Sequence, residues 1–132
     1  MGEDERLFIY PMKLNLPVDP GFFFDFMAIQ EVKLDTHKTA RNASNWRETH
    51  VAAVKQLGDD RVEEICNSDE YAALYDINAK VFRAVDAAKT DSVLASEVDA
   101  LNYSRYTRKI ALQAKFFPDT EVSEQKLGYG AS

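Results

Sequence analysis

Three cationic side chains, Arg105, Arg108 and Lys109, lie close together in the sequence beside Tyr103 and Tyr106. Cations bind phosphate and aromatic rings stack on bases, so this segment could contact a nucleotide, a sugar phosphate or single-stranded nucleic acid. The competing interpretation is structural, because cations late in a helix offset the negative end of its dipole and pair with acids of neighbouring helices. The net charge of −6 favours the structural interpretation, and the five glycines form no phosphate-binding loop.

A second polar group consists of Asp25, Glu31 and Lys33, from the segment GFFFDFMAIQEVKL, together with the distant Asn78. The simpler interpretation of Asp25 is a solvated acid on the outer side of an amphipathic helix. The alternative is a polar contact in which the three charged residues meet Asn78, although Glu31 and Lys33 are two residues apart and need different partners. Asn78 interrupts an apolar region, and we expect it to fix the register of packed helices rather than to contact a ligand.

Few residues suit nucleophilic or metal chemistry. His37 and His50 are the only histidines, and neither has a second histidine or a cysteine at helical spacing, so we expect no metal site. Cys66 is the only cysteine, which excludes an internal disulfide. A lone cysteine is more often a small buried hydrophobe than a nucleophile. We therefore expect no catalytic residue and no cofactor, and the sequence favours a protein that is not an enzyme.

The bulk composition predicts a single domain. The chain has 132 residues, of which 45% are apolar and 29% charged, as in ordinary soluble domains. Its excess of acids argues against broad binding to nucleic acid or to an anionic membrane. The first residues are acidic where a signal peptide would be basic, and no apolar run approaches the roughly 18 residues that cross a bilayer. We therefore expect a cytoplasmic protein that does not enter the membrane.

The distribution of prolines predicts helices through the middle of the chain. No proline occurs from residue 21 to 117, and apolar side chains recur there every three or four residues. We expect an all-α domain over residues 1–132, an antiparallel bundle or hairpin of three to four helices. A short extended arm should precede it at residues 1–18, and an extended tail should follow at 119–132. Helices are expected over about 20–38, 45–57, from a cap at Ser68 onward, and about 92–117, with an acidic turn or short helix at 59–66.

Three stretches carry a resemblance to known sequences: GFFFDFMAIQEVKL, LYDINAKVFRAVD and SEQKLGY. They resemble an uncharacterised bacterial family of short helical proteins known only as a domain of unknown function. The resemblance implies a helical fold and a bacterial or phage-like source, and it brings no established activity. Some members of that family lie near glycan-building enzymes, which indicates context only. Phe22 and Phe26 stand where the family has Glu and Lys. The shared residues are Gly21, Asp25, Ile29, Glu31, Lys33, Leu34, Leu74, Tyr75, Ile77, Asn78, Asp86, Glu124 and Lys126.

Two functions follow as hypotheses. The first is a non-enzymatic helical interaction protein that self-associates, with a dimer favoured, because long amphipathic helices with broad aromatic faces offer large surfaces. The alternative is a small-ligand-binding or enzymatic accessory of bacterial surface-glycan metabolism. In that hypothesis Arg105, Arg108 and Lys109 would meet a phosphate, while Asp25 or Glu31 would place a hydroxyl.

Overall fold

The computed structural model describes residues 13–88 and 95–122. Within these residues the chain is all-helical and forms no strand, which confirms the predicted fold class. None of the described helices combines the length and the apolar character that a membrane span requires. The five helices are α2 (Pro20–Thr36), α3 (Ala40–Leu57), α4 (Asp59–Cys66), α5 (Asp69–Ala88) and α6 (Ala95–Phe116).

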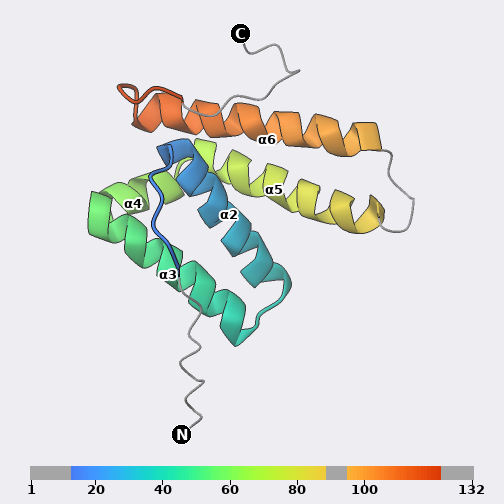
Figure 1. Ribbon diagram of the computed structural model, residues 1–132, viewed down its shortest axis with the longest axis horizontal. Helices are drawn as coiled ribbons and strands as arrows, with labels where there is room; N and C mark the ends of the chain where they lie inside the picture. Colours follow the sequence, from blue (N-terminus) through green and yellow to red (C-terminus); the bar gives the residue numbers. More distant parts are fainter. Residues whose placement is uncertain (1–12, 89–94, 123–132) are drawn as a thin grey trace, which may run out of the picture.

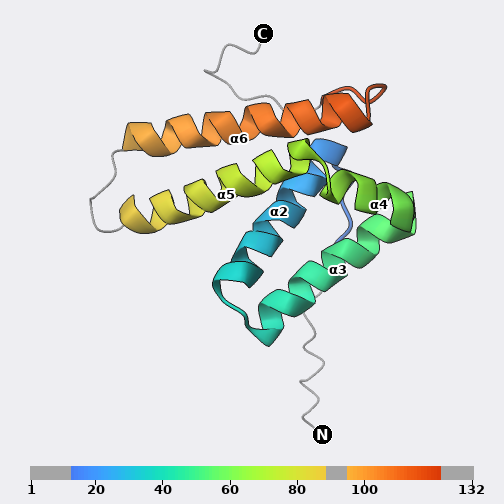
Figure 2. The ribbon, with the colours of Figure 1, turned by 180° about the vertical axis from the view of Figure 1, so that it is seen from behind.

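Four of these helices form two antiparallel pairs, α2 with α3 and α5 with α6, and the two pairs cross each other (Figure 1). Helices α5 and α6 lie side by side as a hairpin, and the view from behind shows the same pairing (Figure 2). Helix α2 crosses this hairpin at an angle and contacts α3, α5 and α6. The prediction of three to four helices in one antiparallel bundle is therefore not matched: the described residues contain five helices, of which four form two crossed pairs and the short α4 belongs to neither.

The helix ends explain part of this difference. Gly58 ends α3 as predicted, but its φ of 88° redirects the chain so that α4 starts at the next residue. Helix α3 begins five residues earlier than expected, because Thr39 caps it by accepting a hydrogen bond from the Asn42 amide at 3.1 Å. The predicted cap at Ser68 is confirmed, since its hydroxyl accepts a hydrogen bond from the Tyr71 amide at 3.1 Å.

The core lies where α2 meets α3, α5 and α6. Helix α2 is buried on more than one side, because it has neighbours in three directions. The side chains of this core come from all five helices, so no helix pair contains a core of its own. Its members are Phe24, Met27, Ala28, Ala53, Val62, Ile65, Tyr71, Leu74, Leu112 and Phe116.

A close backbone approach joins the start of α2 to the end of α6. The Gly21 amide donates a hydrogen bond to Gln113 Oε1 at 2.9 Å, and both residues are buried. The same glutamine donates from Nε2 to the carbonyls of Thr120 and Glu121, each at 3.3 Å. A Cβ at position 21 would lie only 2.7 Å from the backbone oxygen of Lys109, so only glycine fits here without displacing α6.

The segment before α2 has no regular secondary structure over residues 13–19. Lys13 forms an ion pair with Glu48 of α3, which holds the segment beside that helix (Figure 1). Most of the predicted arm, residues 1–12, lies outside the described residues. The predicted tail is described only to residue 122, and residues 119–122 are not helical.

We predict that Gly21→Ala lowers the free energy of unfolding by about 1–3 kcal/mol, since the new methyl group would overlap a backbone atom that cannot rotate away. Urea unfolding followed by circular dichroism measures this loss. Gly58→Ala is the control, because position 58 has open space around it and a new side chain there is strained only by the positive φ. This variant should lower the free energy of unfolding by about 1 kcal/mol. An unchanged midpoint for Gly21→Ala would contradict the close approach.

Candidate functional site

Asp25 is a buried carboxylate at the point where α2 crosses the hairpin. Its side chain is only 2% exposed. The carboxylate accepts hydrogen bonds from Asn78 of α5 and from Arg105 of α6, so three helices meet at one charged group. Burial of an unpaired carboxylate is costly, and these donors offset that cost. The interpretation of Asp25 as a solvated surface acid is therefore wrong.

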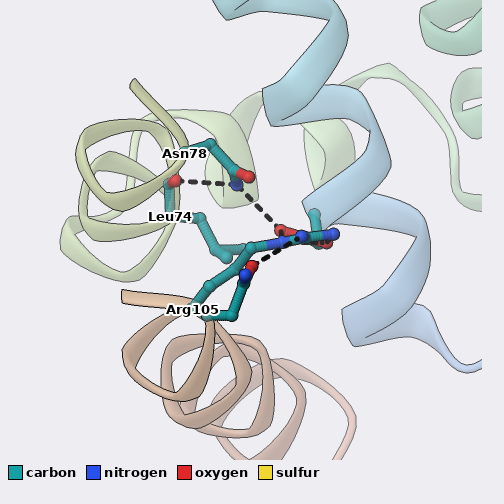
Figure 3. A network of polar contacts seen from close by, with 5 residues as sticks. Leu74, Asn78 and Arg105 are labelled. Carbon is teal, nitrogen blue, oxygen red and sulfur yellow. Dashed lines mark hydrogen bonds and ion pairs between the residues drawn. The ribbon is translucent and has the colours of Figure 1, made fainter. Parts of the chain in front are cut away.

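Asn78 bridges α5 to α2. Its Nδ2 donates to Asp25 Oδ1 at 2.8 Å and to the Leu74 carbonyl of its own helix at 3.0 Å (Figure 3). The residue is 4% exposed, so this amide is satisfied by protein groups rather than by solvent. A buried amide that joins α5 to α2 is the kind of contact that the sequence predicted for Asn78, in which a polar residue fixes how two helices pack.

Arg105 supplies the charge that balances Asp25. Its Nε lies 3.2 Å from Asp25 Oδ1 and 3.1 Å from Oδ2, and its Nη2 lies 2.8 Å from Oδ2, so both carboxylate oxygens accept hydrogen bonds. This two-point geometry is available to a guanidinium and not to an ammonium group. The Arg105 side chain is 28% exposed, so the ion pair has one edge near solvent.

Glu31 and Lys33 have different surroundings. Glu31 accepts a hydrogen bond from the buried Tyr71 hydroxyl at 2.8 Å. Burial, and then the negative charge of Glu31, raise the pKa of Tyr71 well above its usual range. Lys33 is exposed, and its backbone carbonyl accepts from the His37 amide at the end of α2. The structure therefore brings together Asp25, Asn78 and Arg105, and places Glu31 and Lys33 elsewhere on α2.

The cations of α6 also separate. Arg105 is held by Asp25, Arg108 is exposed, and Lys109 is 5% exposed with its Nζ 5.3 Å from the centre of the Phe22 ring. Lys115 pairs with Glu70 of α5 at 3.1 Å. A hydrogen bond from its own backbone amide, and then the hydrogen bond from Lys115, lower the pKa of Glu70. Arg105 and Lys115 therefore pair with acids of neighbouring helices, as the structural interpretation of this segment predicts.

Cys66 lies half-buried at the end of α4, with its Sγ 3.9 Å from Met27 Sδ. Burial, and then the charge of Glu31, raise the pKa of the Cys66 thiol to about 11. The thiolate is the reactive form of cysteine, so this environment suppresses nucleophilic chemistry near neutral pH. Among the described residues, no three His, Cys, Asp or Glu side chains lie close enough to hold a metal ion.

Tyr71 and Gln113 were not singled out from the sequence, although each connects two helices. Their hydrogen-bond partners, Glu31 and the Gly21 amide, lie 40 and 92 residues away, so no local spacing identifies either contact.

Comparisons with family models, curated proteins and solved structures found no match to this chain. The geometry therefore defines a buried polar network that joins helices, in which each strong hydrogen-bonding group already has a protein partner.

We predict that Arg105→Gln lowers the free energy of unfolding by about 3–5 kcal/mol, because it leaves the Asp25 charge buried without a cation. Asp25→Asn in the same protein should recover part of this loss, since the neutral amide requires no counter-charge. Urea unfolding of the two single variants and the double variant measures the coupling between them. Arg108→Gln is the matched control, because it changes an exposed residue and should leave the free energy of unfolding nearly unchanged. If the losses of the two single variants simply add in the double variant, the pairing of Asp25 with Arg105 is contradicted.

We also predict slow alkylation of Cys66 in the folded protein. With a thiol pKa of about 11, the thiolate at pH 8 is scarcer, by roughly a hundredfold, than for an ordinary cysteine. The rate should increase with pH up to about 11, and in urea it should increase at pH 8. Mass spectrometry after iodoacetamide treatment measures the rate. Equal rates at pH 8 for folded and unfolded protein would contradict the buried thiol.

Proposed function

We propose that this chain is a non-enzymatic helical interaction protein that associates with copies of itself. The observation that carries the proposal is a set of large apolar side chains left exposed next to one another in the sequence. Leu14 and Leu16 are 85% and 76% exposed, and Val18, Phe22 and Phe26 are each at least 40% exposed. We call these five residues the apolar strip. Where exposed apolar side chains form one contiguous patch, they mark an interaction surface in a soluble protein, and we propose that these five form such a patch.

The apolar strip has two parts that differ in shape and rigidity. Leu14, Leu16 and Val18 alternate along a segment without regular structure, so in an extended backbone they point to the same side. Phe22 and Phe26 are four residues apart on α2 and therefore lie on one side of a well-packed helix. In the proposed dimer the aliphatic segment of one copy covers the aromatic pair of the second copy, and the segment of the second copy covers the aromatic pair of the first.

A symmetric dimer is the assembly that this surface favours. In a two-fold interface the same patch serves both partners, and a patch with two complementary halves meets that condition. The buried polar groups do not compete for this role, because Asp25, Asn78 and Arg105 already satisfy one another. We propose that the protein works in the bacterial cytoplasm. The acidic composition, the single cysteine and the sequence resemblance support this location. Membership of the family that the sequence resembles remains a prediction.

The alternative function, an accessory of surface-glycan metabolism, rests on the sequence resemblance. Its site would need Arg105, Arg108 and Lys109 to converge on a phosphate. In the structure these cations have three different surroundings, since one pairs with Asp25, one is exposed and one is buried near Phe22. No contact of the described residues favours this alternative over self-association.

We predict a dimer in light scattering coupled to size-exclusion chromatography, with a mass that decreases toward the monomer on dilution. The double variant Leu14→Asp/Leu16→Asp should be a monomer at concentrations where the natural protein is a dimer, because charges would replace the most exposed apolar residues. Both positions precede α2, so the helical fold should be retained, which circular dichroism verifies.

Val51→Asp is the matched control for self-association. Val51 is 49% exposed on α3, outside the apolar strip, so this change adds a charge at an exposed apolar position without altering the surface proposed to pair. It should leave the dimer intact. A natural protein that is monomeric at all concentrations would overturn the proposal, and equal dissociation by both variants would place the interface elsewhere.

A further inference from the structure

A groove of about 400 Å³ lies between the C-terminal part of α2 and the middle of α5. Its volume falls within the range of roughly 300–1,000 Å³ that small-molecule sites occupy. The groove is separate from the buried network around Asp25 and shares no residue with the apolar strip. Its lining residues are Val32, Thr36, Tyr75, Asp76, Ala79, Lys80, Phe82 and Arg83.

The hollow exists because a small residue stands between two aromatic ones. Tyr75, Ala79 and Phe82 follow at spacings of four and three, so they share one side of α5. The methyl group of Ala79 leaves space between the two aromatic side chains, and Val32 and Thr36 of α2 line the opposite side.

Each aromatic residue also bridges the two helices. The Tyr75 hydroxyl donates to Asp35 Oδ2 at 2.6 Å, and the Phe82 ring lies edge-on to the His37 ring, with centroids 6.4 Å apart. The hydrogen bond to Asp35 raises the pKa of Tyr75 to about 12, so the hydroxyl remains a donor at physiological pH. On α5 the lining extends only from Tyr75 to Arg83, about two helical turns, which suits a small molecule.

Charged side chains border the groove along a neighbouring line of α5. Asp76, Lys80 and Arg83 also follow at spacings of four and three, and all three are exposed. Within the described residues neither Lys80 nor Arg83 forms an ion pair, whereas Arg105 and Lys115 do. Two cations one helical turn apart, beside an aromatic ring, therefore remain able to bind an anion.

We infer that this groove binds a nucleoside monophosphate. The base would stack on the Phe82 ring, the phosphate would meet Lys80 and Arg83, and Asp76 would accept hydrogen bonds from the ribose hydroxyls. Stacking on an aromatic ring tolerates any base, and a guanidinium beside an ammonium group is suited to phosphate. Asp76, at the other end of the same line, can accept hydrogen bonds from ribose hydroxyls, which a simple inorganic anion lacks. The inference does not depend on self-association, since it uses different residues.

Isothermal titration calorimetry with AMP, GMP, CMP and UMP tests the inference, with adenosine and ribose 5-phosphate as the two parts of one ligand. We expect at least one monophosphate to bind at least tenfold more tightly than either part, because both the ring and the phosphate contribute. If ribose 5-phosphate binds as tightly as AMP, the groove holds only an anion and the inference is overturned. Absence of binding by all four monophosphates at millimolar concentration would also overturn it.

Two variants locate the site. Ala79→Leu should fill the hollow without changing any charge, and Lys80→Gln/Arg83→Gln should remove the cations while leaving the hollow intact. Each should weaken binding of the monophosphate at least tenfold. The matched control is Lys55→Gln/Arg108→Gln, which removes two exposed cations from other helices and should leave binding unchanged.

The variants also separate folding from binding. Ala79 is half-buried, so circular dichroism and the unfolding midpoint must first show that Ala79→Leu is folded. The double variant changes only exposed residues and provides the test if Ala79→Leu does not fold. Retained affinity in the double variant, or an equal loss in the control, would overturn the assignment of the ligand to this groove.

Discussion

Burial of one carboxylate constrains how the helices of this protein are arranged. Asp25 is almost fully enclosed, and a charge in that position requires donors that approach from within the protein. Asn78 and Arg105 provide them from the two helices of the hairpin, so α2 must cross α5 and α6 at the level of both residues. A shift of α2 by one helical turn would leave the carboxylate without these partners.

Two further contacts hold the C-terminal end of α6. Gln113 joins its last turns to the start of α2, and Arg61 of α4 donates to the Phe116 carbonyl at its end. The Arg61 guanidinium also lies over the rings of Phe116 and Phe117, so a cation both satisfies a terminal carbonyl and covers aromatic surface. Together with the Arg105 ion pair, these contacts fix α6 against α2 and α4. The first turns of α6 lie beyond these contacts (Figure 1).

The sequence was sufficient to predict helices, because the long interval without proline, the cap at Ser68 and the break at Gly58 are local signals. It was insufficient for Asp25, because the periodicity of α2 was interpreted as one apolar face and one solvated face, whereas this helix has neighbours in three directions. The pairing of α6 cations with acids was predicted in kind, but Arg105 and Asp25 are 80 residues apart and no spacing connects them. The spacing of Tyr75, Ala79 and Phe82 is equally visible in the sequence, yet it defines a hollow only once α2 is known to pass beside it.

The contact between Gly21 and Gln113 has a consequence for how the chain folds during synthesis. Its two residues are separated by 92 positions, and those of the Asp25 ion pair by 80. Most helical proteins rely on contacts between near neighbours in sequence, which lets them form structure early and quickly. Here α2 leaves the ribosome before α6, and it obtains its charge partner and its terminal hydrogen bond only after α6 has been made. Folding of α2 therefore depends on α6, and a chain that terminates before α6 keeps Asp25 among phenylalanines without the cation that neutralises it.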